Sequence, residues 1–406
     1  MTAADRLAAS TPNPPAAAGD PGPASVLIVA GEASGDWAGA LLARELRRRD
    51  AALRCLGVGG PRMAAAGVDL VADSRGWGAI GVYEAARKLP RVWRAVRSLR
   101  ARLVDDPPTA LVLIDCGAVN LGLAHLARNR GIPLLYYFPP GSWSRRPRSL
   151  ELREVADVVA TPFPWSATLL SGGRARVHWV GHPVVEAARP GISPEDACAK
   201  YGVNPARPTV AFAPGSRDQE LHYLLPVLAG AAARLAARFP GLQVLVPVAE
   251  GRDPARVAGR LASPGVTVIP LRGMEYDALQ LAQAAAVCSG TATLEFACLG
   301  IPMAVIYRAS RVTTLQYRLF RGLLGRQRFA AMPNIIADRE IVRELLGSRA
   351  QPQTIADEIA DLLSDRARAA RLRSDLRAMA AALGPPGASA RTADLVLDLL
   401  RRRRGP

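Results

Sequence analysis

The chain has few aromatic residues and no long uninterrupted apolar run. Aromatic residues make up 5% of its 406 residues, whereas hydrophobic residues make up 50%. This composition fits helices packed on parallel sheets better than a sandwich of aromatic-rich strands. No apolar stretch reaches the roughly 18 residues that a membrane-spanning helix needs. The sequence therefore predicts an α/β protein, and any contact with a membrane is expected to be peripheral.

Disulfide, export and metal signals are also missing. Scattered thiols without a C-x-x-C pair are typical of a reduced, cytosolic protein. The first residues lack a basic segment followed by an apolar one, so no secretory signal is expected. There is no Asp-x-Asp motif and no His or Cys spacing suited to a metal, and we expect chemistry without a metal or cofactor. The cysteines, odd in number, are Cys55, Cys116, Cys198, Cys288 and Cys298.

Acidic residues are in deficit. Lys and Arg number 52 against 35 Asp and Glu, which gives a net charge of +17. Such a charge favours an anionic partner, either nucleic acid, anionic lipid headgroups or a phosphorylated substrate, although a genome rich in arginine codons would also produce it. No basic motif interleaved with aromatic residues is present, and no nucleic-acid partner is expected.

The length predicts two domains of ordinary size. Residues 1–24 are rich in Ala, Pro, Gly and Thr and predict a disordered extension. Strands alternating with helices follow in two series, which predicts two Rossmann-like halves whose strand ends face one cleft. The halves are expected at 25–186 and 208–365, with a linker at 187–207 and C-terminal helices and a basic tail at 366–406. Strands are expected at 26–30, 53–58, 110–114, 134–138, 158–160, 177–180, 209–213, 243–248, 266–270, 284–288 and 303–307.

A glycine-rich loop, Gly31-Glu32-Ala33-Ser34-Gly35-Asp36, follows the first strand. Because Gly31 and Gly35 have no Cβ, a ligand can approach the backbone closely where the next helix starts. The loop is not the dinucleotide fingerprint G-x-G-x-x-G, and a tight turn capped by Ser34 or Asp36 is the alternative.

Two turns in the second half predict a nucleotide site. Pro214-Gly215-Ser216-Arg217 ends a strand, and its arginine adds a permanent charge and a bidentate geometry suited to phosphate. Ser289-Gly290-Thr291 ends a later strand, and Glu295 can accept two hydrogen bonds from the vicinal hydroxyls of a ribose. The alternatives are an ordinary turn with Ser216 as the helix cap, and a capping box that uses Glu295.

A candidate base lies in the first half, at the end of the apolar run 111–114. Asp115 follows that run, and loss of solvent at the edge of a sheet can raise its pKa towards the range of a general base. A cap on the next helix is the alternative role. His182, between Gly181 and Pro183, is expected to contact substrate, with a hinge residue as the alternative.

One basic helix suggests a membrane surface. From Arg91 to Leu103 apolar residues share one helical face and arginines cover the rest, with Trp93 among them. Such a helix can lie on anionic lipid, or it can pack on a sheet at the surface of a domain. Leu315–Leu324 has the same character, and two such segments favour lipid.

Together these motifs resemble the lipid-A-disaccharide synthase family, inverting glycosyltransferases of the GT-B fold. The similarity runs from about Val26 to Leu346. It is carried by ordered blocks: GEASGD at 31–36, GGPRM at 59–63, the strand with Asp115 and Asn120, GHP at 181–183, PGSR at 214–217, SGTATLE at 289–295 and MPNIIADRE at 332–340.

The resemblance implies transfer of 2,3-diacylglucosamine from its UDP derivative to 2,3-diacylglucosamine 1-phosphate, which gives a β-1,6 disaccharide and UDP. By position, Asp115 matches the family's essential aspartate, and Arg217 and Glu295 match contacts with diphosphate and ribose. Asn334 and Glu340 lie in the block that closes the nucleotide pocket. The other substrate-binding residues expected are Gly31, Glu32, Ser34, Gly35, Asp36, Asn120, His182, Met274, Ser289, Gly290 and Thr291.

The resemblance also implies a cytoplasmic protein that associates peripherally with the anionic inner leaflet of the inner membrane; a homodimer stays open. Three positions depart from the family pattern. Gly117 and Ala118 stand where members commonly have Pro and a second Asp, and Arg145 stands where they have Trp. A paralogue with another lipid acceptor and a non-catalytic UDP-sugar-binding protein at the membrane surface are the alternatives.

Overall fold

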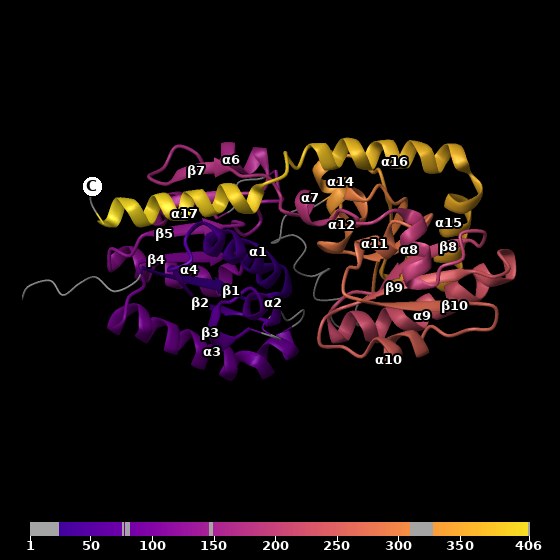
Figure 1. Cartoon of the computed structure of the whole chain (residues 1–406), viewed down its shortest axis with the longest axis horizontal. Helices are drawn as coiled ribbons and strands as arrows, with labels where there is room; N and C mark the ends of the chain where they lie inside the picture. The colour runs from indigo at the N-terminus through magenta and orange to yellow at the C-terminus, as the bar shows by residue number, and fades with distance from the viewer. Residues whose placement is uncertain (1–23, 75–76, 78–81, 146–148, 309–327, 405–406) are drawn as a thin grey trace, which may run out of the picture.

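The structure is a computed structural model that describes residues 24–74, 77, 82–145, 149–308 and 328–404. The chain forms two α/β lobes that lie side by side, and its last helix returns to the first lobe (Figure 1). The extension expected at 1–24 lies outside the described residues except for Ala24.

The elements follow one another in a regular alternation of strand and helix. The first lobe contains β1 (Ser25–Ala30), α1 (Ala33–Arg49), β2 (Arg54–Gly59), α2 (Pro61–Ala65), β3 (Asp69–Asp73), α3 (Val82–Asp105), β4 (Ala110–Ile114), α4 (Gly117–Asn129), β5 (Leu134–Tyr137), α5 (Leu152–Val155), β6 (Val158–Thr161), α6 (Pro164–Leu170) and β7 (Arg176–Trp179). Two helices lead out of it, α7 (Val184–Ala187) and α8 (Pro194–Tyr201), the second within the segment expected as a linker.

The second lobe repeats the alternation. It contains β8 (Thr209–Ala213), α9 (Asp218–Arg238), β9 (Gln243–Val248), α10 (Pro254–Gly259), β10 (Thr267–Arg272), α11 (Tyr276–Leu279), β11 (Ala284–Cys288), α12 (Ala292–Cys298), β12 (Met303–Tyr307), α14 (Met332–Ala337), β13 (Arg343–Leu346), the 3-10 turn η1 (Gly347–Arg349), α15 (Pro352–Ser364) and α16 (Arg366–Ala381). The last helix is α17 (Ala388–Arg404).

Both sheets are parallel and doubly wound. Their strand orders are β3-β2-β1-β4-β5-β6-β7 and β10-β9-β8-β11-β12-β13, which confirms the expected α/β class with two Rossmann-like halves. Each order reverses once, between β1 and β4 and between β8 and β11. Ligands of open parallel sheets bind outside the carboxyl ends of the strands at such reversals.

Two strands, β3 and β13, were missed by the sequence prediction, and both lie at sheet edges. Their sequences, Asp-Leu-Val-Ala-Asp and Arg-Glu-Leu-Leu, carry charges where the central strands carry continuous apolar runs. A strand with only one neighbour is less enclosed, and charged residues keep its free edge from pairing with another chain.

Successive apolar side chains of the central strands point to opposite faces of the sheet, and so the first lobe has a hydrophobic core on each face. In β1, Val26 and Ile28 pack on the face covered by α1 and α17, while Leu27 and Val29 pack on the face covered by α3 and α4. This period of two is what a strand buried on both faces requires. The second lobe has one large core, which includes α9, α12, α15 and α16.

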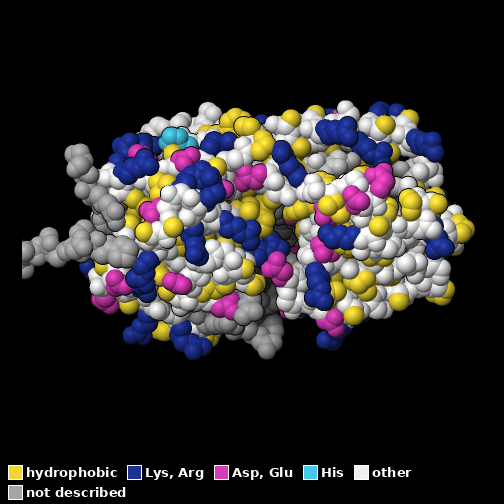
Figure 2. Space-filling view, viewed as in Figure 1, with side chains coloured by type: hydrophobic (Ala, Val, Ile, Leu, Met, Phe, Trp, Pro, Cys, Tyr) yellow, Lys and Arg dark blue, Asp and Glu magenta, His cyan; other side chains and the backbone are white. Residues whose placement is uncertain are grey.

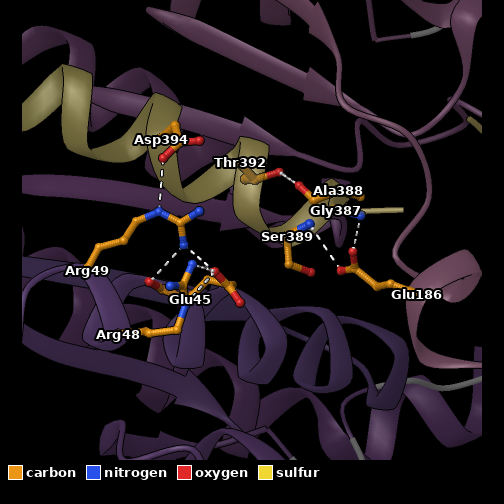
Figure 3. Close-up of polar contacts among 9 residues, drawn as sticks. All are labelled: Glu45, Arg48, Arg49, Glu186, Gly387, Ala388, Ser389, Thr392 and Asp394. Atoms are coloured by element: carbon orange, nitrogen blue, oxygen red, sulfur yellow. Dashed lines mark hydrogen bonds and ion pairs between the residues drawn. The ribbon is translucent and has the colours of Figure 1, made fainter. Parts of the chain in front are cut away.

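The chain crosses between the lobes twice, and the two crossings lie together. The backbone N–H of His182 donates to the carbonyl of Leu383 at 2.9 Å. The Arg391 guanidinium donates to the carbonyl of Val180. The Glu186 carboxylate accepts the N–H groups of Gly387 and Ser389, where α17 begins (Figure 3).

After the second crossing, α17 packs on α1. Its side chains Ala393, Val396, Leu399 and Leu400 are buried in the core of the first lobe. Arg49 of α1 bonds both to Glu45 and to Asp394 of α17 (Figure 3). The C-terminal helix therefore belongs physically to the lobe that the N-terminal half of the chain builds.

The basic segment at 91–103 lies within α3. Leu99 and Leu103 are buried against the sheet, whereas Trp93 is 60% exposed, and Arg94 and Arg97 are exposed as well. The second basic segment, 315–324, lies outside the described residues. Among the helices of the described part, none combines the length and apolar character required to span a membrane.

Candidate functional site

The loops at the two strand-order reversals meet between the lobes. They enclose a cavity of about 220 Å³, and in Figure 2 the lobes meet along a hollow bordered by hydrophobic, basic and acidic side chains. The first lobe contributes Ser34, Gly35, Trp37, Ile114, Asp115, Phe138, Pro139, Gly141, Ser142, Trp143, Phe163 and His182, and the second contributes Gly290, Thr291, Leu294 and Met332.

Asp115 lies at the carboxyl end of β4 and lines this cavity. Burial, and then the charge of Glu32, raise the pKa of its carboxyl to about 6. A carboxyl with this pKa is ionised at neutral pH and is more basic than an ordinary aspartate. The N-cap of α4 is Cys116, so the Asp115 side chain is not the helix cap that was the alternative.

The backbone that presents Asp115 is strained. Asp115 and Cys116 both have positive φ angles, 48° and 47°, as does Phe138 after β5, at 54°. The strain is held by hydrogen bonds: the carbonyl of Asp115 accepts from the Tyr136 hydroxyl at 2.6 Å and from Asn120 Nδ2 at 3.0 Å. Strained backbone conformations persist only where the surrounding structure fixes them, and they cluster at functional sites. Asn120, expected to bind substrate, is fully buried and positions Asp115.

The glycines of the first loop are needed for packing. A Cβ on Gly31 would come 2.4 Å from Cys116 Sγ, and one on Gly35 would come 3.2 Å from the Cβ of Ala30. Gly31 thus lets the loops after β1 and β4 lie against each other. Gly35, together with Ser34, also lines the cavity as expected for a ligand loop.

Asp36, predicted to bind substrate, is buried and joins two of the sequence motifs. Its carboxylate accepts the backbone N–H groups of Gly60, Arg62 and Met63 at 2.6, 3.2 and 3.0 Å. These N–H groups open α2 and have no partner within the helix, so a remote carboxylate takes the place of a cap. The block Gly59–Met63 is thereby tied to the loop after β1.

His182 is buried in an aromatic wall of the cavity. Its ring lies 5.2 Å from Phe138, 5.9 Å from Phe163 and 6.5 Å from Trp37, measured between centroids. Burial lowers its pKa to about 3, so the ring is neutral. Nδ1 accepts the N–H of Val184 at 3.1 Å, and the single ring proton therefore belongs on Nε2.

Arg217 is the N-cap of α9 and reaches across to the first lobe. Its guanidinium pairs with Glu32 Oε2 and with Glu220 Oε1, each at 3.0 Å. The cap is thus Arg217 and not Ser216. A second ion pair between the lobes joins Arg62 and Glu250 at 2.9 Å.

Glu295 lies in the first turn of α12 and is 8% exposed. Burial raises its pKa, and the carboxylate accepts a hydrogen bond from the Tyr276 hydroxyl at 2.6 Å. It makes no capping bond, because Thr291 is the N-cap and has no side-chain cap. Tyr276 was not singled out in the sequence, since a tyrosine after an edge strand carries no motif.

The remaining residues expected at the second-lobe site fall into two groups. Gly290 and Thr291 line the cavity, while Ser289 donates to the carbonyl of Ala330 at 3.0 Å and thereby holds the following segment. Met274 is half-buried against the core of the second lobe, in the loop after β10.

Asn334 is buried and its amide is used within its own lobe. Nδ2 donates to the carbonyl of Val342 and to Glu344, and Oδ1 accepts the N–H groups of Ile341 and Val342, all at 2.8–3.0 Å. Asn334 thus shapes the segment that carries Met332 to the cavity. Glu340 is exposed to solvent.

Arg145, which departs from the family pattern, joins the lobes. Its Nη2 donates to the carbonyl of Ile336 at 2.9 Å, and the guanidinium lies 4.5 Å from the centre of the Trp165 ring. Trp165 in turn stacks on Phe163, a residue of the cavity wall, at 5.0 Å. Arg145 therefore places a cation over an aromatic ring next to the cavity wall. Ala118 is exposed.

Over the described ranges, His, Cys, Asp and Glu side chains form no group of three or more that could hold a metal ion. Asp115 and His182 line the cavity and supply a carboxylate base and a neutral imidazole donor, whereas Arg217 and Glu295 are not among its lining residues and supply a guanidinium and a second carboxylate beside it in the second lobe. This set suits proton transfer to a base in one lobe and binding of a polyhydroxylated, anionic ligand by the other.

Comparison with known proteins gives a consistent picture. A family model described as lipid-A-disaccharide synthetase matches residues 26–395. The lipid-A-disaccharide synthase of Geobacter metallireducens is 36% identical over 380 residues, 93% of this chain and 98% of that protein.

Two solved structures share the fold. The UDP-GlcNAc 2-epimerase of Neisseria meningitidis bound to UDP-GlcNAc has a TM-score of 0.61 at 14% identity, over 92% of this chain and 100% of that one. CalG4, the calicheamicin glycosyltransferase, has a TM-score of 0.59 at 19% identity, over 94% of this chain and 99% of that one. This likeness and the two parallel sheets identify the arrangement as the GT-B fold.

Proposed function

The chain belongs to the lipid-A-disaccharide synthetase family of glycosyltransferases, and we propose that it transfers 2,3-diacylglucosamine from its UDP derivative to the 6-hydroxyl of 2,3-diacylglucosamine 1-phosphate. The products are a β-1,6-linked disaccharide and UDP. The observation that carries the proposal is the shared cavity, which is lined both by Asp115 of one lobe and by the Gly290-Thr291 turn of the other.

In this proposal Asp115 is the general base. Its carboxylate takes the proton of the 6-hydroxyl while that oxygen forms a bond to C1 of the donor sugar. The bond from C1 to the diphosphate breaks, and its electron pair stays on the diphosphate oxygen. Attack from the face opposite the leaving group inverts C1. The raised pKa of Asp115, about 6, supports the role because the group is ionised and basic at neutral pH.

The second lobe holds the nucleotide. The positive charge of Arg217 offsets the charge that develops on the leaving diphosphate. The Glu295 carboxylate, oriented by the hydroxyl of Tyr276, accepts hydrogen bonds from the ribose. Ser34, Gly35, Gly290 and Thr291 contribute the backbone surface of the pocket.

His182 contacts a substrate oxygen through Nε2–H. Three aromatic rings around it support this role, because they keep the imidazole neutral and leave it a donor at any physiological pH. The apolar wall that these rings form also suits the sugar and the first carbons of an acyl chain.

The site of action is the cytoplasmic surface of the inner membrane. Acylated substrates reside in the leaflet, and α3 offers the exposed Trp93 with exposed arginines beside it. A helix with an aromatic residue and basic side chains on its outer face binds anionic headgroups without spanning the bilayer.

The test is a reaction of the purified protein with UDP-2,3-diacylglucosamine and 2,3-diacylglucosamine 1-phosphate, read as UDP release and as the mass of the disaccharide. Turnover with both substrates is expected. UDP binding without turnover would favour a non-catalytic protein. Turnover only when the acceptor is replaced by another phosphorylated lipid would favour a paralogue, which the absence of a second carboxylate at Ala118 makes worth testing.

A further inference from the structure

Arg217 is paired with two carboxylates of different character. Glu220, one turn further along α9, has a side chain that is only 5% exposed. Glu32 comes from the other lobe, and its side chain is 39% exposed, as is that of Arg217. The two carboxylates accept hydrogen bonds from guanidinium N–H groups, and a diphosphate would bind to the same N–H groups. One of its partners is fixed, and the other is accessible to solvent.

Glu220 also occupies the turn before α9. Its Oε2 accepts the backbone N–H groups of Ser216 and Arg217 at 2.9 and 3.1 Å. A Cβ at Gly215, whose φ is +100°, would come 2.3 Å from the same oxygen. The N–H groups of Ser216 and Arg217 are therefore already satisfied. The edge of the Arg217 guanidinium that faces Glu32 is the charged group that an anion arriving at the turn can take.

We propose that Glu32 is a placeholder for the diphosphate of the donor: it holds Arg217 across the cleft in the free protein and is displaced from it when the ligand binds. The inference rests on the proposed function, in which Arg217 binds the diphosphate. One guanidinium edge cannot serve two anions, and the diphosphate carries more charge than a carboxylate. Glu32 is then a positioning residue that lowers donor affinity, and it makes no contact with the nucleotide.

Displacing the Glu32 carboxylate from Arg217 costs little free energy. Ion pairs between half-exposed side chains contribute about 0–1 kcal/mol because solvent screens them. Glu32 is the N-cap of α1 and makes no side-chain capping bond, so the helix does not depend on its carboxylate. The displaced carboxylate stays close to Asp115, on whose pKa its charge already acts.

The test is the affinity for UDP of Glu32→Gln, measured by titration calorimetry at low and at high salt. The variant keeps the shape of the side chain and removes its charge. Binding about two- to fivefold tighter than in the unmodified protein is expected at low salt, with a smaller difference at high salt because ions screen an exposed pair. A residue that contacts the nucleotide directly would give the opposite sign, and weaker binding by Glu32→Gln overturns the proposal.

Glu250→Gln is the matched control. It breaks the other ion pair between the lobes, with Arg62, and Glu250 is 47% exposed, similar to Glu32. Its affinity for UDP should stay within about twofold. An equal gain in both variants would mean that any loosening of the lobes favours binding, and it would also overturn the role of Glu32.

Inorganic pyrophosphate, titrated in parallel, separates this inference from the proposed function. If the unmodified protein binds pyrophosphate but not UDP, and Glu32→Gln binds pyrophosphate more tightly, the placeholder stands and the UDP-sugar function fails. If the unmodified protein binds UDP and Glu32→Gln does not tighten it, the function stands and the placeholder fails. Binding of neither probe contradicts both.

Discussion

At the scale of one residue, Asp115 has a backbone conformation and a burial that are both unfavourable for an aspartate. Its φ of 48° is unfavourable for most side chains, and its carboxyl is held where burial opposes ionisation. Asn120 and Tyr136 hold its carbonyl, and the apolar strand before it fixes its place. The protein thus sacrifices stability at the position where the proposed reaction needs a base.

The substitution Asp115→Asn tests this conflict. Asn tolerates a positive φ as well as Asp does, so the backbone should keep its conformation. We expect turnover to be lost, UDP affinity to stay within a few-fold, and the free energy of unfolding at pH 8 to rise by about 2 to 3 kcal/mol, since one pKa unit corresponds to about 1.4 kcal/mol. UDP release, calorimetry and urea denaturation measure the three effects.

The pH dependence of that stability gain is the control. The pKa of Asp115 is raised in the fold from 3.8 to about 6, so the folded state binds the proton more tightly than the unfolded chain does. The carboxyl therefore costs stability once the pH rises through 6 and costs nothing below about 4. If Asp115→Asn stabilised the protein equally at pH 4 and at pH 8, the assignment would be contradicted.

The same group sets the acid limb of the reaction. In a plot of kcat/KM against pH, activity should fall about tenfold per unit below pH 6 as Asp115 becomes protonated. Glu32→Gln should move this limb to lower pH because it removes a neighbouring negative charge. Cys116 is next to Asp115 in the chain and His182 lines the same cavity, and with pKa values of about 11 and 3 both stay neutral over this range. If the acid limb does not move in this variant, the charge of Glu32 does not raise the pKa of Asp115.

At the scale of elements, most of the fold could be predicted from the sequence because central parallel strands are continuous apolar runs. β4 and β8 lie where their apolar residues place them. β3 and β13 could not be found in the same way, since edge strands tolerate charge. Likewise, the sequence identified the loop Gly31–Asp36 as a site. It did not show that the Asp36 carboxylate accepts the backbone N–H groups at the start of α2.

Helix α17 provides a prediction for an element. Leu400 is buried in the first lobe although the chain reaches it last. Leu400→Ala should lower the free energy of unfolding by about 2 kcal/mol, the lower end for a buried leucine because the site lies near the end of α17. Asp394→Ala, on the same helix, removes an ion pair whose aspartate is 65% exposed and should change stability by less than about 0.5 kcal/mol. Urea denaturation of both variants measures the difference, and equal effects would mean that α17 does not pack as described.

At the scale of the whole molecule, the two lobes are coupled by paired crossings and by contacts over the cleft. The crossing at His182 lies against the return segment at Leu383, and His182 also lines the cavity. Ion pairs at Arg217 and Arg62 and the bond from Arg145 join the facing surfaces. Movement of one lobe relative to the other would therefore change the cavity and these contacts together.

The net charge of +17 raises the question of where a membrane would bind. If α3 is the contact, Arg94→Ala/Arg97→Ala should weaken binding to vesicles that contain anionic phospholipid by about thirtyfold, since each basic residue near such a surface contributes about 1 kcal/mol. Arg366→Ala/Arg371→Ala removes the same charge from exposed positions of α16 and is the control. Cosedimentation at two salt concentrations measures both, and an equal loss would indicate attraction by net charge alone.

The sequence by itself determined the α/β class, the two halves and the strand ends that carry the site, because apolar runs and turn residues act locally. It also supplied the motifs that place the chain in its family. Only the tertiary structure decided which motif residues face the cavity: Asp115 and His182 do, whereas Asp36 and Asn334 hold the backbone around it. The reason is physical. A carboxylate or amide in a loop can bind a ligand or an N–H group of its own chain, and what decides between them is the element that packs beside it, which can come from far away in the sequence.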